Sequence, residues 1–172
     1  ADPSVAAAAG YAGAPKTGAN QVLTVVEGAT GDITSSLLQA VDSDNDTLQR
    51  QYRITTATAF GSVNLNGVPQ GVGSTFTQKD SDDGKLTYVH NGSENFADHF
   101  DFVVSDGVLA TPSSRFDILV TPTNDAPTVV APAGPVNIDS AAGANNPVGA
   151  FVVADAELTT LSPGETDFVQ VT

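Results

Sequence analysis

Acidic side chains recur at short intervals along this chain, and their types and spacing could support one kind of chemistry. The stretch VDSDND puts carboxylates on alternate positions directly after an apolar residue, and PTNDAPT, residues 122–128, puts an amide and an acid between two prolines. Carboxylate and amide oxygens are the ligands that Ca²⁺ prefers in proteins. The candidates in these stretches, with the acid that follows the apolar run FVVS, are Asp42, Asp44, Asp46, Asp106, Asn124 and Asp125.

Turn capping is the structural alternative for each of these residues. Aspartate and asparagine side chains often accept hydrogen bonds from nearby backbone N–H groups and so stabilise turns. The loop that begins at Asp42 is not an EF-hand, because Thr47 and Arg53 stand where that loop needs its glycine and its final glutamate. The acidic stretch KDSDDGK, residues 79–85, is interpreted as a solvated turn.

Catalytic chemistry has little support in the sequence. GVGSTF begins like a dinucleotide-binding loop, but Phe76 stands where the last glycine belongs. The two histidines, His90 and His99, lie in or beside predicted strands, where we interpret them as residues of a sheet surface. Aromatic residues are 6% of the chain and tryptophan is absent, which argues against a sugar-binding platform. We therefore expect no enzymatic activity.

Composition narrows the class of partner. The 172 residues carry 20 acidic and 6 basic side chains, a formal net charge of −14. Nucleic acid and anionic membranes bind clusters of lysine and arginine and repel carboxylates, so we expect neither as a partner. The absence of cysteine excludes disulfides and thiolate metal sites. No run of residues approaches the length of a membrane span, so we expect no direct membrane insertion.

Short runs of alternating apolar residues, separated by turn residues, predict an all-β sandwich from residue 21 onward. The alternation is clearest in DHFDFVVS and RFDILVT, and weaker runs follow Val22, Tyr52, Val63 and Leu86. NLNGVPQG, HNGSE and SDGV carry the residues that tight turns favour. TSSLLQAV is the one stretch that suggests a helical turn. The number of strands suits a seven-stranded immunoglobulin-like sandwich.

An internal repeat predicts the domain organisation. GPVNIDSAAG followed by VGAFVVADAE echoes QVLTVVEGAT followed by SSLLQAVDSD, and an acid follows the second apolar run each time. We predict a flexible Ala/Gly-rich lead-in, whose first residues could be left from a tag, a complete sandwich, a joint and an incomplete second sandwich. These correspond to residues 1–20, 21–121, 122–128 and 129–172. A tail of this kind could also add a strand to a neighbouring chain.

Three motifs, in this order, resemble the cadherin-like repeats of large bacterial surface adhesins, and more closely the chondroitin-sulfate-proteoglycan type of that repeat. They are VVEGATGDITSSLLQAVDSDNDTL, FTQKDSDDGKLTYVHNGSENFADHFDFVVSDG and VTPTNDAP, and they cover residues 25–127. The resemblance implies an immunoglobulin/cadherin-like Greek-key sandwich. It also implies a calcium site at each joint, built from both neighbouring repeats.

The family's ligands can be carried over to matching positions. The downstream joint would take Glu27, Glu94, Asn124 and Asp125, with Asp155 of the next copy; the upstream joint would take Asp42, Asp44 and Asp106. The chain departs from the cadherin pattern, because Pro122 replaces the first aspartate at the joint and NGSE stands in for Leu-Asp-Arg-Glu. Fewer ligands imply that each joint binds Ca²⁺ more weakly or binds fewer ions.

The sequence thus predicts an extracellular, calcium-stiffened extender repeat of a secreted or cell-surface adhesin, whose partners are neighbouring repeats of the same parent chain. The alternative is a sandwich module that binds a surface glycan or a protein, in a homophilic contact or on a secreted enzyme. A glycan-binding sandwich should expose clustered aromatics, whereas Tyr52 and Tyr88 fall on predicted core positions.

Overall fold

The computed structural model of the protein describes residues 13–43, 45–126, 128–130 and 152–154. The chain forms two compact units, Ala1–Thr123 and Asn124–Thr172. Among the described residues of the second unit are two short antiparallel strands, β12 (Thr128–Val130) and β13 (Val152–Ala154). No helix within the described ranges is long and apolar enough to cross a membrane.

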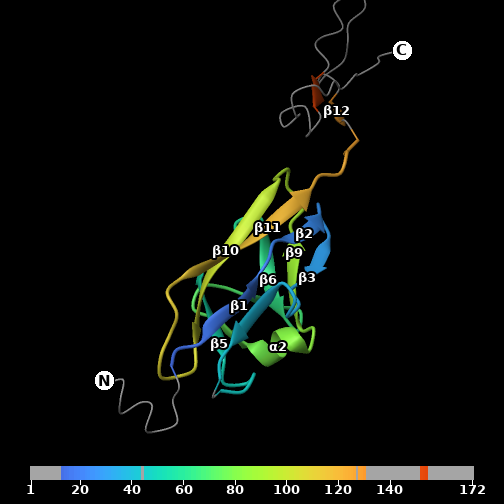
Figure 1. The fold of residues 1–172 in the computed structure, drawn as a ribbon. Coiled ribbons are helices and arrows are strands. Elements are labelled where there is room, and N and C mark those ends of the chain that lie inside the picture. The colour runs from blue at the N-terminus through green and yellow to red at the C-terminus, as the bar shows by residue number, and fades with distance from the viewer. Residues whose placement is uncertain (1–12, 44, 127, 131–151, 155–172) are drawn as a thin grey trace, which may run out of the picture. The chain divides into compact units, whose positions relative to one another are not determined.

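The first unit is a sandwich of a five-stranded and a four-stranded sheet, with a further two-stranded sheet of β1 (Lys16–Asn20) and β4 (Leu38–Val41) (Figure 1). The five-stranded sheet contains, in spatial order, β2 (Leu23–Val26), β11 (Ser114–Thr121), β10 (Ala97–Ser105), β5 (Gln51–Thr56) and β8 (Thr75–Thr77). The four-stranded sheet contains β3 (Thr30–Asp32), β9 (Leu86–His90), β6 (Gly61–Leu65) and β7 (Val68–Gln70). The pairing is antiparallel except between β11 and β2. The predicted all-β sandwich is confirmed.

Alternation places one side of each long strand in the core. In β10 and β11 every second side chain is buried, as the period of an extended chain requires. The aromatic residues that fill the space between the sheets are Tyr52, Phe76, Tyr88, Phe100, Phe102 and Phe116. Tyr52 and Phe76 stack with ring centroids 4.8 Å apart. Burial of each such ring contributes about 1.5–3 kcal/mol to folding.

Two predicted turns have the expected form. Asn66 and Gly67, in NLNGVPQG, both have positive φ, 51° and 77°, and join β6 to β7 in a tight hairpin. In TSSLLQAV the N–H groups of Leu37 and Leu38 both donate to the Thr34 carbonyl, which makes a single turn. The chain then continues as strand β4 (Leu38–Val41).

Three sequence-based expectations about local structure were wrong. Lys16–Asn20 is not part of a flexible lead-in but strand β1, which pairs with β4. KDSDDGK is not a plain turn, because it contains most of helix α2 (Gln78–Asp82). His90 is not a surface residue, since only 3% of it is exposed.

Candidate metal site

One end of the sandwich brings an acidic turn next to the point where the chain leaves the first unit. Strand β2 runs parallel to β11, and the Glu27 N–H donates to the Thr121 carbonyl at 2.9 Å. Ala29 N–H donates to the Val26 carbonyl at 3.0 Å, which closes the turn, and Gly28 supplies its positive φ of 66°. Glu27 therefore stands beside the end of β11.

The Glu27 carboxylate contacts the segment that follows β11. Its Oε2 accepts a hydrogen bond from the Thr123 N–H at 3.1 Å and lies 3.5 Å from the Thr123 hydroxyl. Asp125 follows Thr123 by two residues, so its Cα lies within about 7 Å of the Thr123 Cα on chain length alone. Asn124 donates from its side-chain amide to the Asp125 carbonyl at 3.2 Å.

A second acidic loop, residues 91–96, joins β9 to β10 at the same end. Ser93 N–H donates to the Asn91 side-chain oxygen at 3.0 Å, and Asn95 N–H donates to the Ser93 carbonyl at 2.8 Å. The Phe96 carbonyl accepts a hydrogen bond from the Val120 N–H at 2.9 Å, which holds the loop against the end of β11. These contacts fix the backbone on both sides of Glu94.

The two loops bring Glu27 and Glu94 together. One carboxylate oxygen of each lies within 4.8 Å of the other, and both side chains are half-buried. Two unit charges at about 4 Å interact by about 1 kcal/mol in water and about 4 kcal/mol near a protein surface. Carboxylate oxygens that face each other in this way fit a hard cation, because a shared ion reverses the sign of the interaction. The donor chemistry thus suits Ca²⁺.

The opposite end of the unit holds the residues predicted for the upstream joint. Asp42 follows β4, is half-buried and lies 3.5 Å from the Asn45 side-chain amide. Asp106 follows β10, and its Oδ1 accepts from the N–H groups of Val108 and Leu109 at 2.7 and 2.6 Å. Its Oδ2 is buried without a hydrogen-bond partner among the described residues. The contacts of Asp106 are those of a turn cap.

Two predicted ligands, Asp44 and Asp155, lie outside the described residues. Among the described residues of the first unit, Glu27 and Glu94 are the predicted ligands whose carboxylates the structure brings together. Asp42 and Asp106 do not form a group of three or more candidate ligands with other described acids. The assignment of all eight predicted residues as calcium ligands stays a prediction.

Asp98 is a buried structural residue of the sandwich. It is 5% exposed and accepts hydrogen bonds from the N–H groups of Ala59 and Phe60 and from the Tyr88 hydroxyl, each at 2.9 Å. The carboxylate fixes the turn between β5 and β6 from inside the sandwich. The alternation in DHFDFVVS did carry a signal of burial, because Asp98 lies on the same face of the strand as Phe100, Phe102 and Val104.

Two further residues at the site were not singled out by sequence reasoning. Thr123 donates to Glu27, and buried His90 accepts hydrogen bonds from both acidic loops, from Gly28 and Gly92. The sequence signal for His90 was its place directly before the turn NGSE, at the end of an alternating run in which Leu86, Tyr88 and His90 share one face.

Comparison with known proteins covers the residues that build the sandwich. A profile of the family described as cadherin-like matches residues 15–120, more than half of the chain. The chain belongs to the cadherin-like family. The family resemblance inferred from the sequence is confirmed.

Three relatives carry similar segments. Extracellular matrix protein 3 of Lytechinus variegatus is 31% identical over 123 residues, which are 71% of this chain and 4% of that protein. Extracellular matrix organizing protein FRAS1 of Homo sapiens is 36% identical over 90 residues, 51% of this chain and 2% of the relative. Chondroitin sulfate proteoglycan 4 of Homo sapiens is 33% identical over 93 residues, 54% of this chain and 4% of the relative. The cadherin-like chain thus spans a small part of each.

Proposed function

We propose that this cadherin-like chain is a calcium-binding extender repeat of an extracellular or cell-surface adhesion protein. The observation that carries the proposal is the pair of carboxylates, Glu27 and Glu94, held at the end of the sandwich from which the chain continues. The names of the relatives are those of extracellular matrix proteins and a proteoglycan, not of enzymes, which supports a structural role outside the cell.

The proposed calcium ligands come from three segments of the chain. Glu27, Glu94 and Asp125 each offer a carboxylate oxygen, and Asn124 offers an amide oxygen. Ca²⁺ takes about six to eight oxygen ligands, so backbone carbonyls, water and Asp155 of the following repeat would complete the set. The bound ion supplies charge neutralisation and a fixed geometry. The neighbouring repeats of the parent chain are the partners that share it.

Linkage gives the mechanism of stiffening. An ion that binds the folded protein and not the unfolded chain stabilises the fold by its binding free energy, about 2.7 kcal/mol at a concentration 100 times the Kd. The same ion favours whichever joint conformation completes its ligand set. We propose that Asp42, Asp44 and Asp106 take part in an equivalent site toward a preceding repeat, and that turn capping is their function where that repeat is missing.

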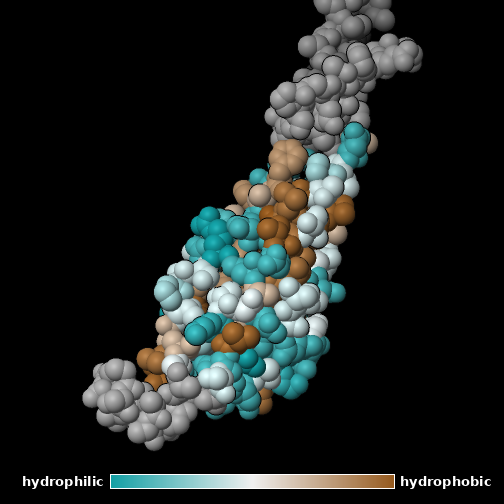
Figure 2. Space-filling view, viewed as in Figure 1, coloured by the Kyte–Doolittle hydropathy of each residue, from teal (hydrophilic) through white to brown (hydrophobic). Residues whose placement is uncertain are grey.

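A protein-binding module is the second candidate, because one outer face carries exposed apolar residues. On the five-stranded sheet Val26 and Leu119 are about half exposed, as is Val22 just before β2, and Phe96 lies in the adjacent loop with 44% of its surface exposed. Figure 2 shows apolar surface gathered over the region of β2 and β11. Glycan binding is less favoured, because Tyr52 and Tyr88 are fully buried and cannot stack on a sugar.

A calorimetric Ca²⁺ titration, paired with thermal melts in calcium and in chelator, tests the extender proposal. Wild type should bind calcium and melt at higher temperature with it. Glu27→Gln and Asp125→Asn should each lower the affinity and the shift in Tm, because each removes a charged ligand. Asp117→Asn is the matched control, since it makes the same charge change on an exposed residue of β11.

The outcomes of these measurements distinguish calcium ligands from turn caps. If wild type shows no binding at millimolar calcium and its melts superimpose, the acids are turn caps and solubilising charge. Screens for protein and glycan ligands then become the next step. If Asp117→Asn weakens binding as much as the two site variants do, calcium affinity depends on the overall charge of the protein, and the assigned site is wrong.

A further inference from the structure

A single buried side chain connects the two acidic loops. His90 is the last residue of β9, and its Nδ1 accepts hydrogen bonds from the Gly28 N–H at 3.1 Å and from the Gly92 N–H at 3.2 Å. The backbone N–H of His90 donates to the Ala29 carbonyl at 3.0 Å. Gly28 directly follows Glu27, and Gly92 is two residues before Glu94, so the imidazole contacts each loop beside its carboxylate.

The loops approach each other closely at the glycines that His90 holds. A Cβ atom built on Gly28 would lie 3.9 Å from the Gly92 Cα. Both glycines have positive φ, 66° and 77°, a conformation that side-chain-bearing residues rarely adopt. These constraints fix the direction of the chain on either side of the imidazole. A shift of either N–H away from Nδ1 would move the adjacent carboxylate.

What His90 supplies here is an acceptor. Because Nδ1 accepts two N–H bonds it carries no proton, so the ring is the neutral form protonated on Nε2. That Nε2 is buried and has no hydrogen-bond partner among the described residues. An apolar residue of similar size would avoid the buried, unpartnered N–H, at the loss of the two bonds at Nδ1. The imidazole is therefore explained by the loops that it joins.

We propose that His90 is a positioning residue that sets the separation of Glu27 and Glu94 and thereby the affinity of the cation that they share. It acts through the Gly28 and Gly92 N–H groups and does not contact the ion. The identity of the ion as Ca²⁺ rests on the proposed function above. Groups that orient metal ligands from outside the coordination sphere typically change metal affinity by about 10- to 100-fold when removed.

The experiment compares two substitutions at the same position by calorimetric Ca²⁺ titration. His90→Asn keeps an acceptor, because the asparagine Oδ1 occupies the place of Nδ1, whereas His90→Leu fills similar space without one. His90→Leu should raise the calcium Kd by about tenfold or more, and His90→Asn should recover most of that loss. Thermal melts in chelator give the Tm of each variant, so that the titrations are made at a temperature where all of them are folded.

A matched control distinguishes positioning from general loss of stability. Gln78 is 1% exposed and, like His90, accepts two hydrogen bonds, from the Ala40 N–H and the Tyr52 hydroxyl. It lies in α2, at the opposite end of the unit from the acidic loops (Figure 1). Gln78→Leu should lower the Tm as much as His90→Leu does and leave the calcium Kd unchanged.

Amide hydrogen exchange in chelator follows the two loops without calcium. The Gly28 and Gly92 amides should exchange faster in His90→Leu than in wild type and regain protection in His90→Asn. If wild type binds calcium and His90→Leu keeps the wild-type Kd, or Gln78→Leu weakens binding equally, the positioning role is overturned while the calcium site stands. If wild type binds no calcium at all, the proposed function fails and the positioning role fails with it.

Discussion

At the scale of the residue, the buried pair of Tyr88 and Asp98 shows how polar groups are accommodated inside the sandwich. The Tyr88 hydroxyl donates to Asp98 at 2.9 Å, and neither side chain is more than 5% exposed. Burial, followed by the hydrogen bond to Asp98 and its negative charge, raises the pKa of Tyr88 well above its usual range. Ionisation of the phenol is therefore less favourable in the folded protein than in the unfolded chain, and it lowers the stability of the fold.

The Tyr88 interaction predicts an alkaline limit to stability. An unfolded tyrosine ionises near pH 10, so the stabilising effect of the raised pKa is complete below about pH 10. It is lost as pH rises from there toward the folded pKa, by up to about 1.4 kcal/mol per pH unit for each such tyrosine. Burial raises the pKa of Tyr52 in the same direction. Both residues should contribute to alkaline unfolding.

Urea unfolding of wild type and Tyr88→Phe between pH 7 and pH 11 measures this effect. At pH 7 the variant should be less stable by about 1 kcal/mol, which is the typical net contribution of one hydrogen bond to stability. Above pH 10 its free energy of unfolding should fall less steeply than that of wild type, because one of the two buried tyrosines no longer titrates. Parallel pH dependences in the two proteins would contradict the assignment.

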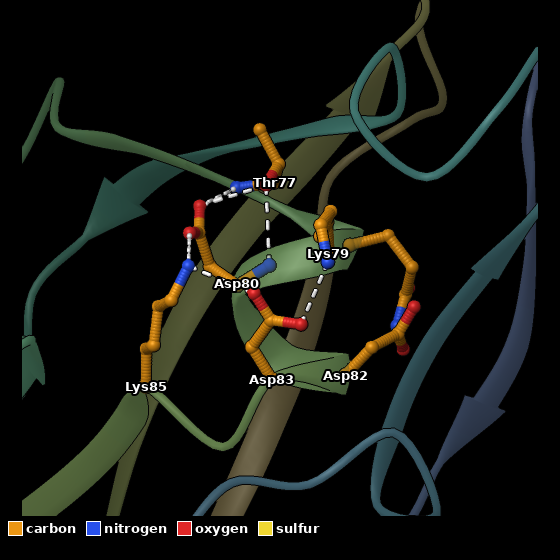
Figure 3. A network of polar contacts seen from close by, with 7 residues as sticks. Thr77, Lys79, Asp80, Asp82, Asp83 and Lys85 are labelled. Atoms are coloured by element: carbon orange, nitrogen blue, oxygen red, sulfur yellow. Dashed lines mark hydrogen bonds and ion pairs between the residues drawn. The ribbon is translucent and has the colours of Figure 1, made fainter.

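At the scale of the element, helix α2 is held by its cap and by contacts with its neighbours rather than by its length. Thr77 and Asp80 form a capping box, in which the Thr77 N–H donates to Asp80 at 2.9 Å and the Asp80 N–H donates to the Thr77 hydroxyl at 3.2 Å. Figure 3 shows this box together with the ion pairs of Lys79 and Lys85. Gln78 anchors the helix to β4 and β5.

Asp80→Ala should destabilise the sandwich by about 1–2 kcal/mol at pH 7, because it removes the carboxylate that accepts from the Thr77 N–H and hydroxyl, which is one half of the capping box. Partial burial opposes ionisation of Asp80, but hydrogen bonds from Thr77 and Lys85 outweigh it and lower the pKa. A lowered pKa stabilises the fold above the unfolded value, near pH 4, and the effect is lost as pH falls through the folded value.

Urea unfolding at pH 7 and at pH 3 checks this prediction. The difference between wild type and Asp80→Ala should be smaller at pH 3 than at pH 7. Asp83→Ala is the control, because Asp83 makes only exposed ion pairs with Lys79 and Lys85, and its effect at pH 7 should be the smaller of the two. An equal effect of both substitutions would mean that the capping box contributes little.

The same elements show how far the sequence could predict the fold. Strands such as β10 and β11 were predicted because large apolar residues alternate over eight or nine residues. β1 was missed because its residues, KTGAN, are small or polar and give no alternation. α2 was missed because five residues are too few to show a helical period. Its formation depends on Thr77 and on tertiary contacts of Gln78.

The candidate site was predictable in its residue types and not in its supporting contacts. The family resemblance named Glu27 and Glu94, and the structure places their carboxylates within 4.8 Å of each other. The roles of His90 and Thr123 depend on how two loops meet, each of which connects the five-stranded sheet with the four-stranded sheet. That meeting depends on the parallel pairing of β2 with β11, which the alternation of neither strand determines.

At the scale of the whole molecule, the acidic balance raises the question of whether calcium acts at a site or on the total charge. A net charge of −14 disfavours the compact state through self-repulsion, so any salt should stabilise the fold to some degree. Screening depends on ionic strength, whereas occupation of a site depends on the identity of the ion. Melts in CaCl₂, MgCl₂ and NaCl at matched ionic strength therefore belong with every calcium titration.

The extent of the core predicts that the first unit folds without the second. All residues of the hydrophobic core lie between Leu23 and Val120, among the described residues, and the first compact unit ends at Thr123. A chain that stops after Thr123 should therefore keep the Tm of the full chain in chelator, since no core contact is removed. It should also keep the Thr123 contact with Glu27.

The shortened chain should differ from the full chain in its response to calcium. It lacks Asn124 and Asp125, which are two of the proposed ligands, and it lacks the following repeat. Its calcium Kd should rise to at least the value for Asp125→Asn in the full chain, and calcium should raise its Tm by less. Unchanged calcium affinity would mean that Glu27 and Glu94 bind the ion within a single repeat. The ion could then stabilise each sandwich but could not stiffen the joint between them.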